Sequence, residues 1–183
     1  MILPIYVYGH PVLRKKTENV SLWNDELKVL VENMFETMYR SSGVGLAAPQ
    51  VGQALRLFVI DTEAYLEAYP NTEVIKEAFI NPEIMEEAGT EFAYSEGCLS
   101  IPDVHADVVR KPIIKVKYTD LEGKEHIRTF EGMAARTFQH EYDHLEGKIF
   151  IDHLPSLTKM LLKRKLTDIA SGKHKPFYKS INK

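Results

Sequence analysis

The sequence predicts an α+β fold in which antiparallel or mixed β-sheets surround a central helix, with one helix near the N-terminus and one near the C-terminus. Helical periodicity is confined to three segments, at about residues 24–40, 133–145 and 156–170, and extended stretches and turns fill the chain between the first two. At 183 residues and 44% hydrophobic composition, the chain can bury one sizeable core but is short for two. We therefore expect a single domain.

The first helix is predicted by its start signal and by its apolar spacing. Ser21 or Asn24 can cap it, because short polar side chains accept hydrogen bonds from the free amides of a first turn. Residues 41–43, Ser-Ser-Gly, end it. Residues 1–8 precede it as a strand or extended arm, since Pro4 interrupts their apolar run. The residues spaced to cover a core are Leu27, Leu30, Val31, Met34, Phe35 and Met38.

Strands and turns follow this helix. Residues 55–60 have the composition of a buried strand, residues 61–77 that of an acidic surface loop, and an extended stretch begins again at Phe79. Residues 113–118 and 126–130 are rich in β-formers and flank a turn that contains glycine. This last pattern predicts a β-hairpin.

Two helices are expected after the hairpin. The central one runs from about Met133 to Leu145, with Gly147 placed to end it. The last runs from about Ser156 to Ala170, with Gly172 beyond its end. Its apolar side is expected to consist of Leu157, Met160, Leu161 and Ile169.

Charge separates a basic tail from an acidic body. Residues 159–183 have a net charge of +7, whereas residues 1–158 have a net charge of −10. The tail is either the solvated face of a terminal helix or a contact for phosphate or an anionic partner. We expect residues 159–183 to form a basic helix and tail within the same domain as residues 1–158. A single cysteine and the lack of a membrane-spanning apolar run predict a cytoplasmic protein with no membrane partner.

A metal-binding motif lies in the predicted central helix, as His140-Glu141-x-x-His144. Two histidines four residues apart lie almost above one another on a helix, so both imidazoles can bind one ion, and Glu141 is a candidate general base. The alternative is two partly buried histidines without a ligand. Phe150 occupies the position of a third histidine ligand, and no glutamate follows Glu146. The two common zinc-peptidase arrangements are therefore excluded.

A third ligand has to come from another part of the chain. Asp152 is one candidate, and Cys98, the single cysteine, is the other. A thiolate with two imidazoles makes a good catalytic set that leaves a fourth position for water. A lone cysteine is also commonly a small buried apolar residue.

The glycine-rich stretch from Gly43 to Gly52 is a second candidate for chemistry. A nucleotide-binding loop is disfavoured, because no Lys-Ser/Thr pair follows. Small residues allow an extended peptide to pair with the backbone, and Gln50 offers an amide donor where negative charge develops. The alternative is an ordinary loop with an exposed glutamine.

The three stretches G-V-G-L-A-A-P-Q, E-G-C-L-S and Q-H-E-Y-D-H-L-E-G, in this order, resemble those of the peptide deformylases. The similarity extends from about Tyr8 to Phe150. It implies a hydrolase that removes the N-formyl group from the formyl-methionine of new polypeptides and releases formate. It also implies one divalent metal held by Cys98, His140 and His144: Fe²⁺ natively, with Zn²⁺, Ni²⁺ or Co²⁺ as substitutes.

Two competing functions are weighed against this one. A metallopeptidase is disfavoured by the missing downstream ligand. A binding module that retains formylated chains without cleaving them would need neither Glu141 nor Gln50, and both are present.

The resemblance assigns roles to individual residues. Glu141 would take a proton from the attacking water and pass one to the leaving amine, while the Leu99 N–H and the Gln50 side chain stabilise the oxyanion. Gly45 would approach the same site. The substrate backbone would pair with residues 43–45 and 95–97. The residues expected to contact substrate are Gly43, Val44, Tyr94, Glu96, Gly97, Met133, Arg136 and Thr137, of which the last three lie on the His140 face of the helix.

The sequence departs from the family pattern at one position. The arginine that commonly follows the cysteine by seven residues is His105 here, so the outer part of the substrate site is expected to differ. Some family members dock at the ribosome through a basic C-terminal helix, and Lys163-Arg164-Lys165 could serve that purpose. No sequence-specific nucleic-acid contact is expected.

Overall fold

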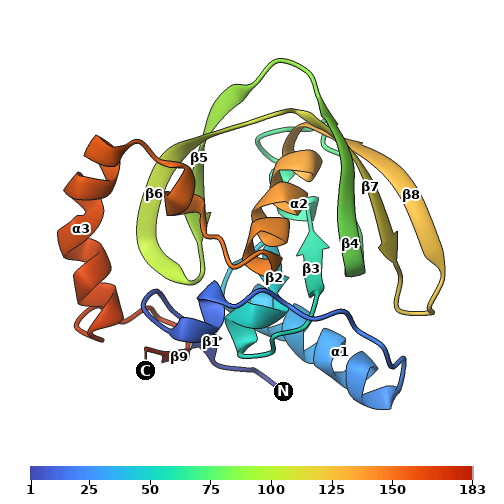
Figure 1. Cartoon of the computed structure of the whole chain (residues 1–183), viewed down its shortest axis with the longest axis horizontal. Coiled ribbons are helices and arrows are strands. Elements are labelled where there is room, and N and C mark those ends of the chain that lie inside the picture. Colours follow the sequence, from blue (N-terminus) through green and yellow to red (C-terminus); the bar gives the residue numbers. More distant parts are fainter. Residues whose placement is uncertain (183) are drawn as a thin grey trace.

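The structure, a computed structural model, describes residues 1–182, so Lys183 of the predicted tail lies outside the described residues. Helix α2 (Gly132–Leu145) occupies the centre, and strands curve around it on two sides (Figure 1). The predicted α+β class with a central helix is confirmed. No helix within residues 1–182 combines the length and the apolar character needed to cross a membrane.

A five-stranded antiparallel sheet packs against one side of α2. Its strand order is β2-β3-β4-β7-β8, and the bounds are β2 (Gly45–Ala47), β3 (Leu57–Asp61), β4 (Lys76–Ala88), β7 (Ile113–Thr119) and β8 (Glu125–Glu131). The predicted hairpin is confirmed as β7–β8. Its turn is closed by Asp120, whose carboxylate accepts from the amides of Glu122 and Lys124.

Aromatic side chains join α2 to this sheet. Phe138 of α2 contacts Phe58 and Phe79 edge-on, with ring centroids 5.0 and 5.1 Å apart, and lies 5.8 Å from Phe130. All four rings are fully buried. Such pairs contribute about 0.5–1.5 kcal/mol beyond the area they bury. They hold α2 at a fixed height and rotation over the sheet. The His140-Glu141-x-x-His144 motif, on the opposite face of α2, therefore has a fixed direction.

Helix α1 (Asp25–Arg40) begins as predicted. The Asn24 side chain accepts from the Leu27 amide at 3.0 Å, which satisfies one of the free donors of the first turn. Leu27, Val31 and Met34 are buried in a cluster that includes β2, β3 and the start of β4.

The second sheet is a long hairpin of β5 (Phe92–Cys98) and β6 (Ile101–Arg110), which covers the side of α2 away from β4 (Figure 1). Its turn is the two residues Leu99 and Ser100, because Cys98 pairs with Ile101. Three further residues of β6 then bulge out before pairing resumes between Gly97 and His105, and Asp103 in this bulge has a φ of +57°. The hairpin places Cys98 over the helix.

Helix α3 (Ser156–Ala170) has the predicted bounds but buries a different face. Leu166 and Ile169 are buried against the β6 side of the molecule, whereas Leu157, Met160 and Leu161 are exposed. The expected apolar side was therefore wrong, except for Ile169. The buried stripe runs from Leu162 through Leu166 to Ile169, at the i, i+4, i+7 spacing of one helix face.

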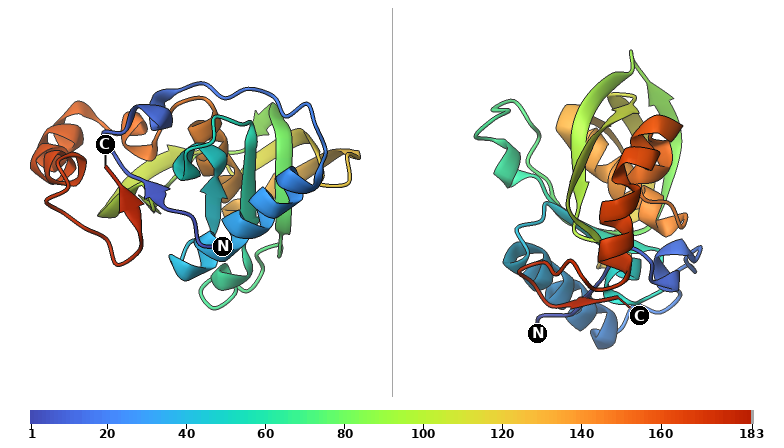
Figure 2. Two further views of the ribbon diagram at one scale, coloured as in Figure 1. Left: turned by 90° about the horizontal axis from the view of Figure 1, so that it is seen from below. Right: turned by 90° about the vertical axis from the view of Figure 1, so that its left-hand side faces the viewer.

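The two ends of the described chain meet. Strand β1 (Ile5–Tyr6) pairs in parallel with β9 (Ser180–Ile181), and the right-hand view of Figure 2 shows both strands at the same end of the molecule as α1. Short 3₁₀ helices complete the fold: η1 (Pro11–Arg14), η2 (Ala48–Val51), η3 (Glu63–Tyr65) and η4 (Phe150–His153).

Candidate active site

Three metal-ligating side chains converge where the β5–β6 hairpin meets α2. The Sγ atom of Cys98 lies 3.3 Å from Nε2 of His144, and the ligand atoms of Cys98, His140 and His144 all lie within 4.8 Å of one another. Cys98 ends β5, and the two histidines project from successive turns of α2. The other candidate, Asp152, pairs with Arg14 and accepts from the Ile149 amide. The structure therefore joins the cysteine, and not Asp152, to the histidines.

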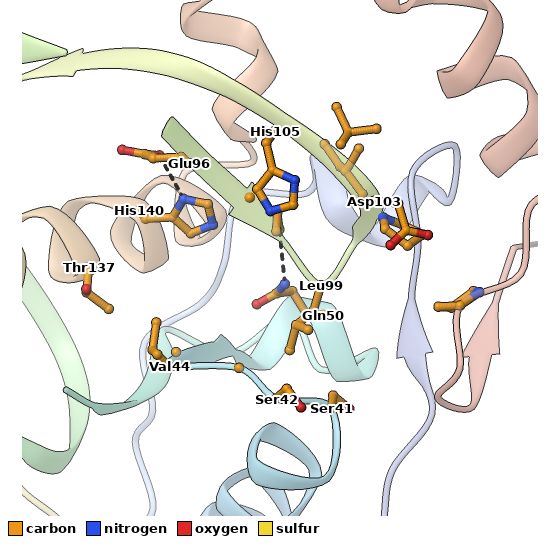
Figure 3. Close-up of a pocket in the computed structure, with 18 of the residues that line it drawn as sticks. Ser41, Ser42, Val44, Gln50, Glu96, Leu99, Asp103, His105, Thr137 and His140 are labelled. Atoms are coloured by element: carbon orange, nitrogen blue, oxygen red, sulfur yellow. Dashed lines mark hydrogen bonds and ion pairs between the residues drawn. The ribbon is translucent and has the colours of Figure 1, made fainter. Parts of the chain in front are cut away.

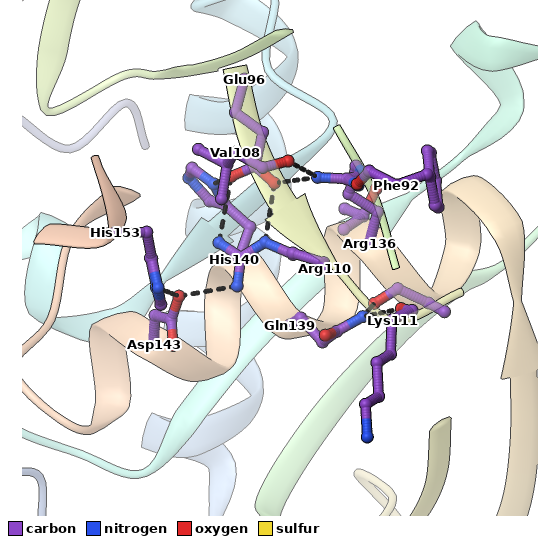
Figure 4. A network of polar contacts seen from close by, with 12 residues as sticks. Phe92, Glu96, Val108, Arg110, Lys111, Arg136, Gln139, His140, Asp143 and His153 are labelled. Atoms are coloured by element: carbon purple, nitrogen blue, oxygen red, sulfur yellow. Dashed lines mark hydrogen bonds and ion pairs between the residues drawn. The ribbon is translucent and has the colours of Figure 1, made fainter. Parts of the chain in front are cut away.

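A buried carboxylate orients one of the two imidazoles. Oε2 of Glu96 lies 2.9 Å from Nδ1 of His140, which leaves Nε2 of that ring free for an ion. The same carboxylate accepts from Arg110 at 2.7 and 3.0 Å and from Arg136 at 2.7 Å (Figure 4). Arg110 continues the network to Asp143, and Asp143 to His153.

The charges of this cluster favour the thiolate form of Cys98 that a metal requires. Burial lowers the pKa of His140, but the hydrogen bonds with Cys98 and Glu96 raise it well above its usual value, so a metal ion would have to displace a proton from this ring. Burial alone would raise the pKa of the Cys98 thiol, but His144 and His140 beside it lower that pKa to about 5. Cys98 is therefore a thiolate at neutral pH. Burial likewise opposes ionisation of Glu96, yet the hydrogen bonds from His140 and Arg110 hold its pKa well below the usual range. A thiolate and two imidazoles, one of them held by a carboxylate, fit a divalent metal ion.

Gln50 is fixed between the glycine-rich stretch and the thiolate. It is 1% exposed on η2, and its Oε1 accepts from the Ala47 amide at 2.8 Å. Its Nε2 therefore points toward β5 (Figure 3). There it lies 3.5 Å from the Cys98 sulfur and donates to the Ser100 hydroxyl at 3.1 Å. This orientation leaves no ambiguity about which end of the amide faces the metal site.

These groups border a cavity of about 700 Å³. One wall is the glycine-rich stretch that leads into β2, and the opposite wall is the end of β5 with the Leu99–Ser100 turn and the bulge of β6 (Figure 3). The floor is the His140 face of α2. A cavity of this size, between the start of β2 and the end of β5, has room for several residues of an extended peptide.

Comparison with known proteins decides the family. The family model described as polypeptide deformylase matches residues 2–160. The chain belongs to the polypeptide deformylase family. It is 48% identical to a peptide deformylase from Christiangramia forsetii over 98% of this chain and 95% of that one, and 44% identical to one from Salinibacter ruber over 100% and 96%.

Solved deformylase structures have the same fold. A Legionella pneumophila peptide deformylase is 39% identical, with a TM-score of 0.83, over 96% of this chain and all of that one. The Thermotoga maritima enzyme is 44% identical, with a TM-score of 0.76, over 85% of this chain and 99% of that one. The protein is accordingly a metal-dependent hydrolase that removes the N-formyl group of formyl-methionine from newly made polypeptides.

In this deformylase, the environment of Glu141 suits a general acid–base residue. It lies on α2 between the two histidines, is 4% exposed and borders the cavity, and its Oε2 has no hydrogen-bond partner among residues 1–182. Burial raises its pKa to about 7, against the lowering effect of His140 and His144. A carboxyl that titrates near neutral pH can both accept and donate a proton.

Gly45 is required by the position of that carboxyl group. A Cβ atom added at residue 45 would lie 2.7 Å from the Cδ of Glu141, which is closer than carbon atoms approach without displacement. Gly43 is confined in the same way by Leu99, whose Cδ1 would lie 2.7 Å from an added Cβ. The glycines thus let the first wall of the cavity approach α2 and the turn closely.

The expected substrate-contacting residues fall into two groups in the deformylase. The larger group borders the cavity: Gly43, Val44, Tyr94, Glu96, Gly97, Arg136 and Thr137. Two of these, Glu96 and Arg136, are also held in the buried network, where Arg136 donates to the carbonyls of Val108 and Phe92. Met133 differs from the expectation, because it is 6% exposed at the start of α2 and does not border the cavity.

Three residues of the active site were not predicted from the sequence. Arg110 lies on β6 and holds Glu96, but a charged residue in a strand is usually solvent-facing, so its burial had no sequence signal. Tyr65 borders the cavity from the segment expected to be a surface loop, and its hydroxyl lies 3.5 Å from that of Thr137. Tyr178 borders it from the C-terminal tail.

Proposed function

We propose that Cys98, His140 and His144 hold one divalent metal ion, Fe²⁺ in the native protein, which Zn²⁺, Ni²⁺ or Co²⁺ can replace. The thiolate, the two imidazoles and the Glu96 bond to His140 support this set. A bound divalent ion supplies Lewis acidity, which polarises the formyl carbonyl and acidifies water. The ligand types suit several metals, so elemental analysis of protein purified without oxygen identifies the native one.

Glu141 is the general base and then the general acid in this proposal. Its side chain borders the cavity, its Oε2 has no hydrogen-bond partner among residues 1–182, and its pKa of about 7 allows it to take a proton from the attacking water and pass one to the departing amine. It is this buried, unpartnered carboxylate between two metal ligands that carries the proposal. In a site that only bound peptides, an unsatisfied carboxylate would lower stability without a compensating use.

The developing oxyanion is stabilised by two donors from opposite walls of the cavity. The Gln50 amide is already aimed at the metal site, because its oxygen is held by the Ala47 amide. The Leu99 N–H comes from the turn next to Cys98. Donors fixed before the reaction stabilise the transition state without reorganisation, and each one contributes about 3 kcal/mol.

The peptide lies between residues 43–45 and residues 95–97, as a strand added between the two walls. Residues 95–97 belong to β5, residues 43–45 lead into β2, and both segments border the cavity. Val44, Tyr94 and Thr137 line the region that receives the methionine side chain. His105, which stands where the family commonly has arginine, is exposed at the outer rim.

Hydrolysis of matched peptides tests this function. Protein purified without oxygen should release formate from a formyl-Met-Ala-Ser peptide and leave the acetyl-Met-Ala-Ser peptide intact. Removal of the metal with a chelator should abolish turnover, and added Fe²⁺ should restore it. A lack of turnover with iron bound would refute the enzymatic function, and equal turnover of both peptides would refute formyl specificity.

We also propose that residues 159–183 belong to the same domain as residues 1–158 and that α3 contacts the ribosome, which places the enzyme in the cytoplasm with its nascent substrates. Leu166 and Ile169 pack into the core, while Lys163 and Arg164 are exposed on the outer face of α3. Ribosomal RNA is an anionic partner suited to this face.

Charge reversal on α3 tests the ribosome contact. The Lys163→Glu/Arg164→Glu variant should lose most of its cosedimentation with ribosomes at low salt, because two attractive charges become repulsive. The Lys28→Glu/Arg40→Glu variant on α1 makes the same change in net charge at exposed positions and should cosediment normally. Equal sedimentation of both variants and the wild type would rule out α3 as the contact.

A further inference from the structure

The chain beyond α3 returns to the active-site cavity instead of extending into solvent. Lys175, Pro176, Phe177 and Tyr178 border the cavity at its outer end. The following residues form β9, which is held by β1 through the bonds from the Ile5 amide to the Lys179 carbonyl and from the Val7 amide to the Ile181 carbonyl, at 2.9 and 3.0 Å. We refer to residues 174–181 as the C-terminal strap.

Within this strap, Tyr178 makes a direct contact with the Leu99–Ser100 turn. Its hydroxyl donates to the Leu99 carbonyl at 2.6 Å. Its ring packs against the core cluster that contains Ile5, Leu46 and Ala48. Burial raises the pKa of Tyr178, so the hydroxyl keeps the proton that it donates.

The turn that receives this bond carries two functional groups, the Cys98 thiolate before it and the Leu99 N–H within it. Ser100, the other turn residue, is already fixed by the N-terminal arm and by η2. Its carbonyl accepts from the Tyr8 amide at 2.7 Å, and its hydroxyl donates to the Tyr6 carbonyl at 2.7 Å and accepts from Gln50 at 3.1 Å. The bond from Tyr178 adds the corresponding restraint on Leu99.

A restraint on the Leu99 carbonyl also acts on the Leu99 amide. The peptide unit before Leu99 starts at Cys98, which is paired with Ile101, and the unit after it is held by Tyr178. With both sides held, little rotation about the φ and ψ of Leu99 remains, and the direction of its N–H is limited. A donor in an oxyanion site is effective to the extent that its direction is fixed before the reaction.

We propose that Tyr178 is a positioning residue of the deformylation reaction, which acts by holding the Leu99–Ser100 turn so that the Leu99 N–H is directed at the oxyanion. The proposal rests on the role of Leu99 under the proposed function. With this role for Tyr178, the C-terminal strap is part of the active site as well as part of the basic tail.

The strap is itself held firmly enough to impose this position. At its start, Nε2 of His174 lies 2.8 Å from the Asp103 carboxylate, in the bulge of β6, and Lys165 of α3 donates to the Asp103 carbonyl. Beyond its end, the Asn182 side chain donates to the Ile169 carbonyl at 2.5 Å. Phe177 between these anchors is 78% exposed and leaves Tyr178 as the strap's inward contact with Leu99.

The Tyr178→Phe variant tests the proposal, because it removes the hydroxyl and keeps the ring. We expect kcat for a formyl-Met peptide to fall by roughly fivefold to tenfold, the effect of losing one neutral hydrogen bond in the transition state. KM should stay within about twofold, because a bond that acts only in the transition state lowers kcat and kcat/KM together. In zinc-loaded protein labelled with ¹⁵N-leucine, the Leu99 amide signal should shift or broaden.

The matched control is Tyr39→Phe. The Tyr39 hydroxyl donates to Asp61 at 2.6 Å, between α1 and β3, and Tyr39 does not border the cavity. This variant should show a similar change in Tm, normal kcat and an unchanged Leu99 signal. If Tyr178→Phe lowers Tm but keeps wild-type kcat and an unchanged Leu99 signal, its role is structural only and the proposal is overturned. Wild-type turnover in the same assay keeps the proposed function standing in that case.

Discussion

Replacing Glu141 by alanine is expected to lower kcat for formyl-Met peptides by about two to four orders of magnitude, the usual contribution of a general acid–base group. The metal content should be unchanged, because Glu141 is not among the three converging ligands. Peptide affinity should also change little. Steady-state kinetics on protein of measured metal content, with formate release as the signal, separate these effects. Turnover that survives the substitution would refute Glu141 as the general base.

A second variant acts on the same carboxylate without removing it. In Gly45→Ala, the added methyl would overlap the Cδ position of Glu141, so the carboxylate has to move within a closed space. We expect kcat to fall, by less than in Glu141→Ala, with the metal content retained. Gly123→Ala in the β7–β8 turn is the control for adding a methyl without a close contact, since its nearest neighbour is 3.7 Å away, on Trp23; its positive φ adds backbone strain that Gly45 does not have. It should affect stability alone.

Replacing Glu96 by alanine is expected to have the largest effect on stability. The side chain is 5% exposed and pairs with Arg110 and Arg136, so its removal leaves buried charges without their partner. The free energy of unfolding should fall by about 3–5 kcal/mol, as it does when one member of a buried ion pair is deleted. Metal affinity should fall by about 10- to 100-fold, because the His140 ring loses the group that orients it.

The two effects of Glu96→Ala require separate measurements. Urea unfolding of the metal-free proteins gives the stability term, because bound metal would itself stabilise the folded state. Competition with a chelator gives the metal affinity. Glu86→Ala removes a carboxylate that is 69% exposed and pairs with Lys115 at 3.4 Å, and it should change stability by less than about 1 kcal/mol. Equal free energies of unfolding for the Glu96 and Glu86 variants would show that the buried network does not stabilise the fold more than an exposed ion pair does.

The elements that were predicted correctly are those whose signals are local. The Asn24 cap, the spacing of Leu27, Val31 and Met34, and the glycine turn of the β7–β8 hairpin each depend on residues a few positions apart. The convergence of His140 and His144 also belongs to this class, since one helix places both. Excluding the two common downstream ligands left Cys98 and Asp152 as candidates for the third ligand, and the resemblance to the deformylases favoured Cys98.

The features that were missed depend on contacts between distant parts of the chain. Glu96 was expected to contact substrate, and its partners Arg110 and Arg136 lie 14 and 40 residues away. Charged residues in strands carry no mark of burial when their partner is remote in sequence. The buried face of α3 was misassigned for a related reason. Apolar residues occur on two sides of this helix, and only the position of β6 decides which side is buried.

The meeting of β1 with β9 has a consequence for how the enzyme matures during synthesis. Every proposed metal ligand has been made once residue 144 is translated, whereas Tyr178 follows more than a helix later. The sheet, α2 and the thiolate can assemble first, and the Leu99 turn gains its last restraint only when a loop from residue 5 to residue 180 closes. If Tyr178 has the proposed role, metal uptake and full catalytic competence are separate events in the folding of one chain, and the second depends on the pairing of β1 with β9.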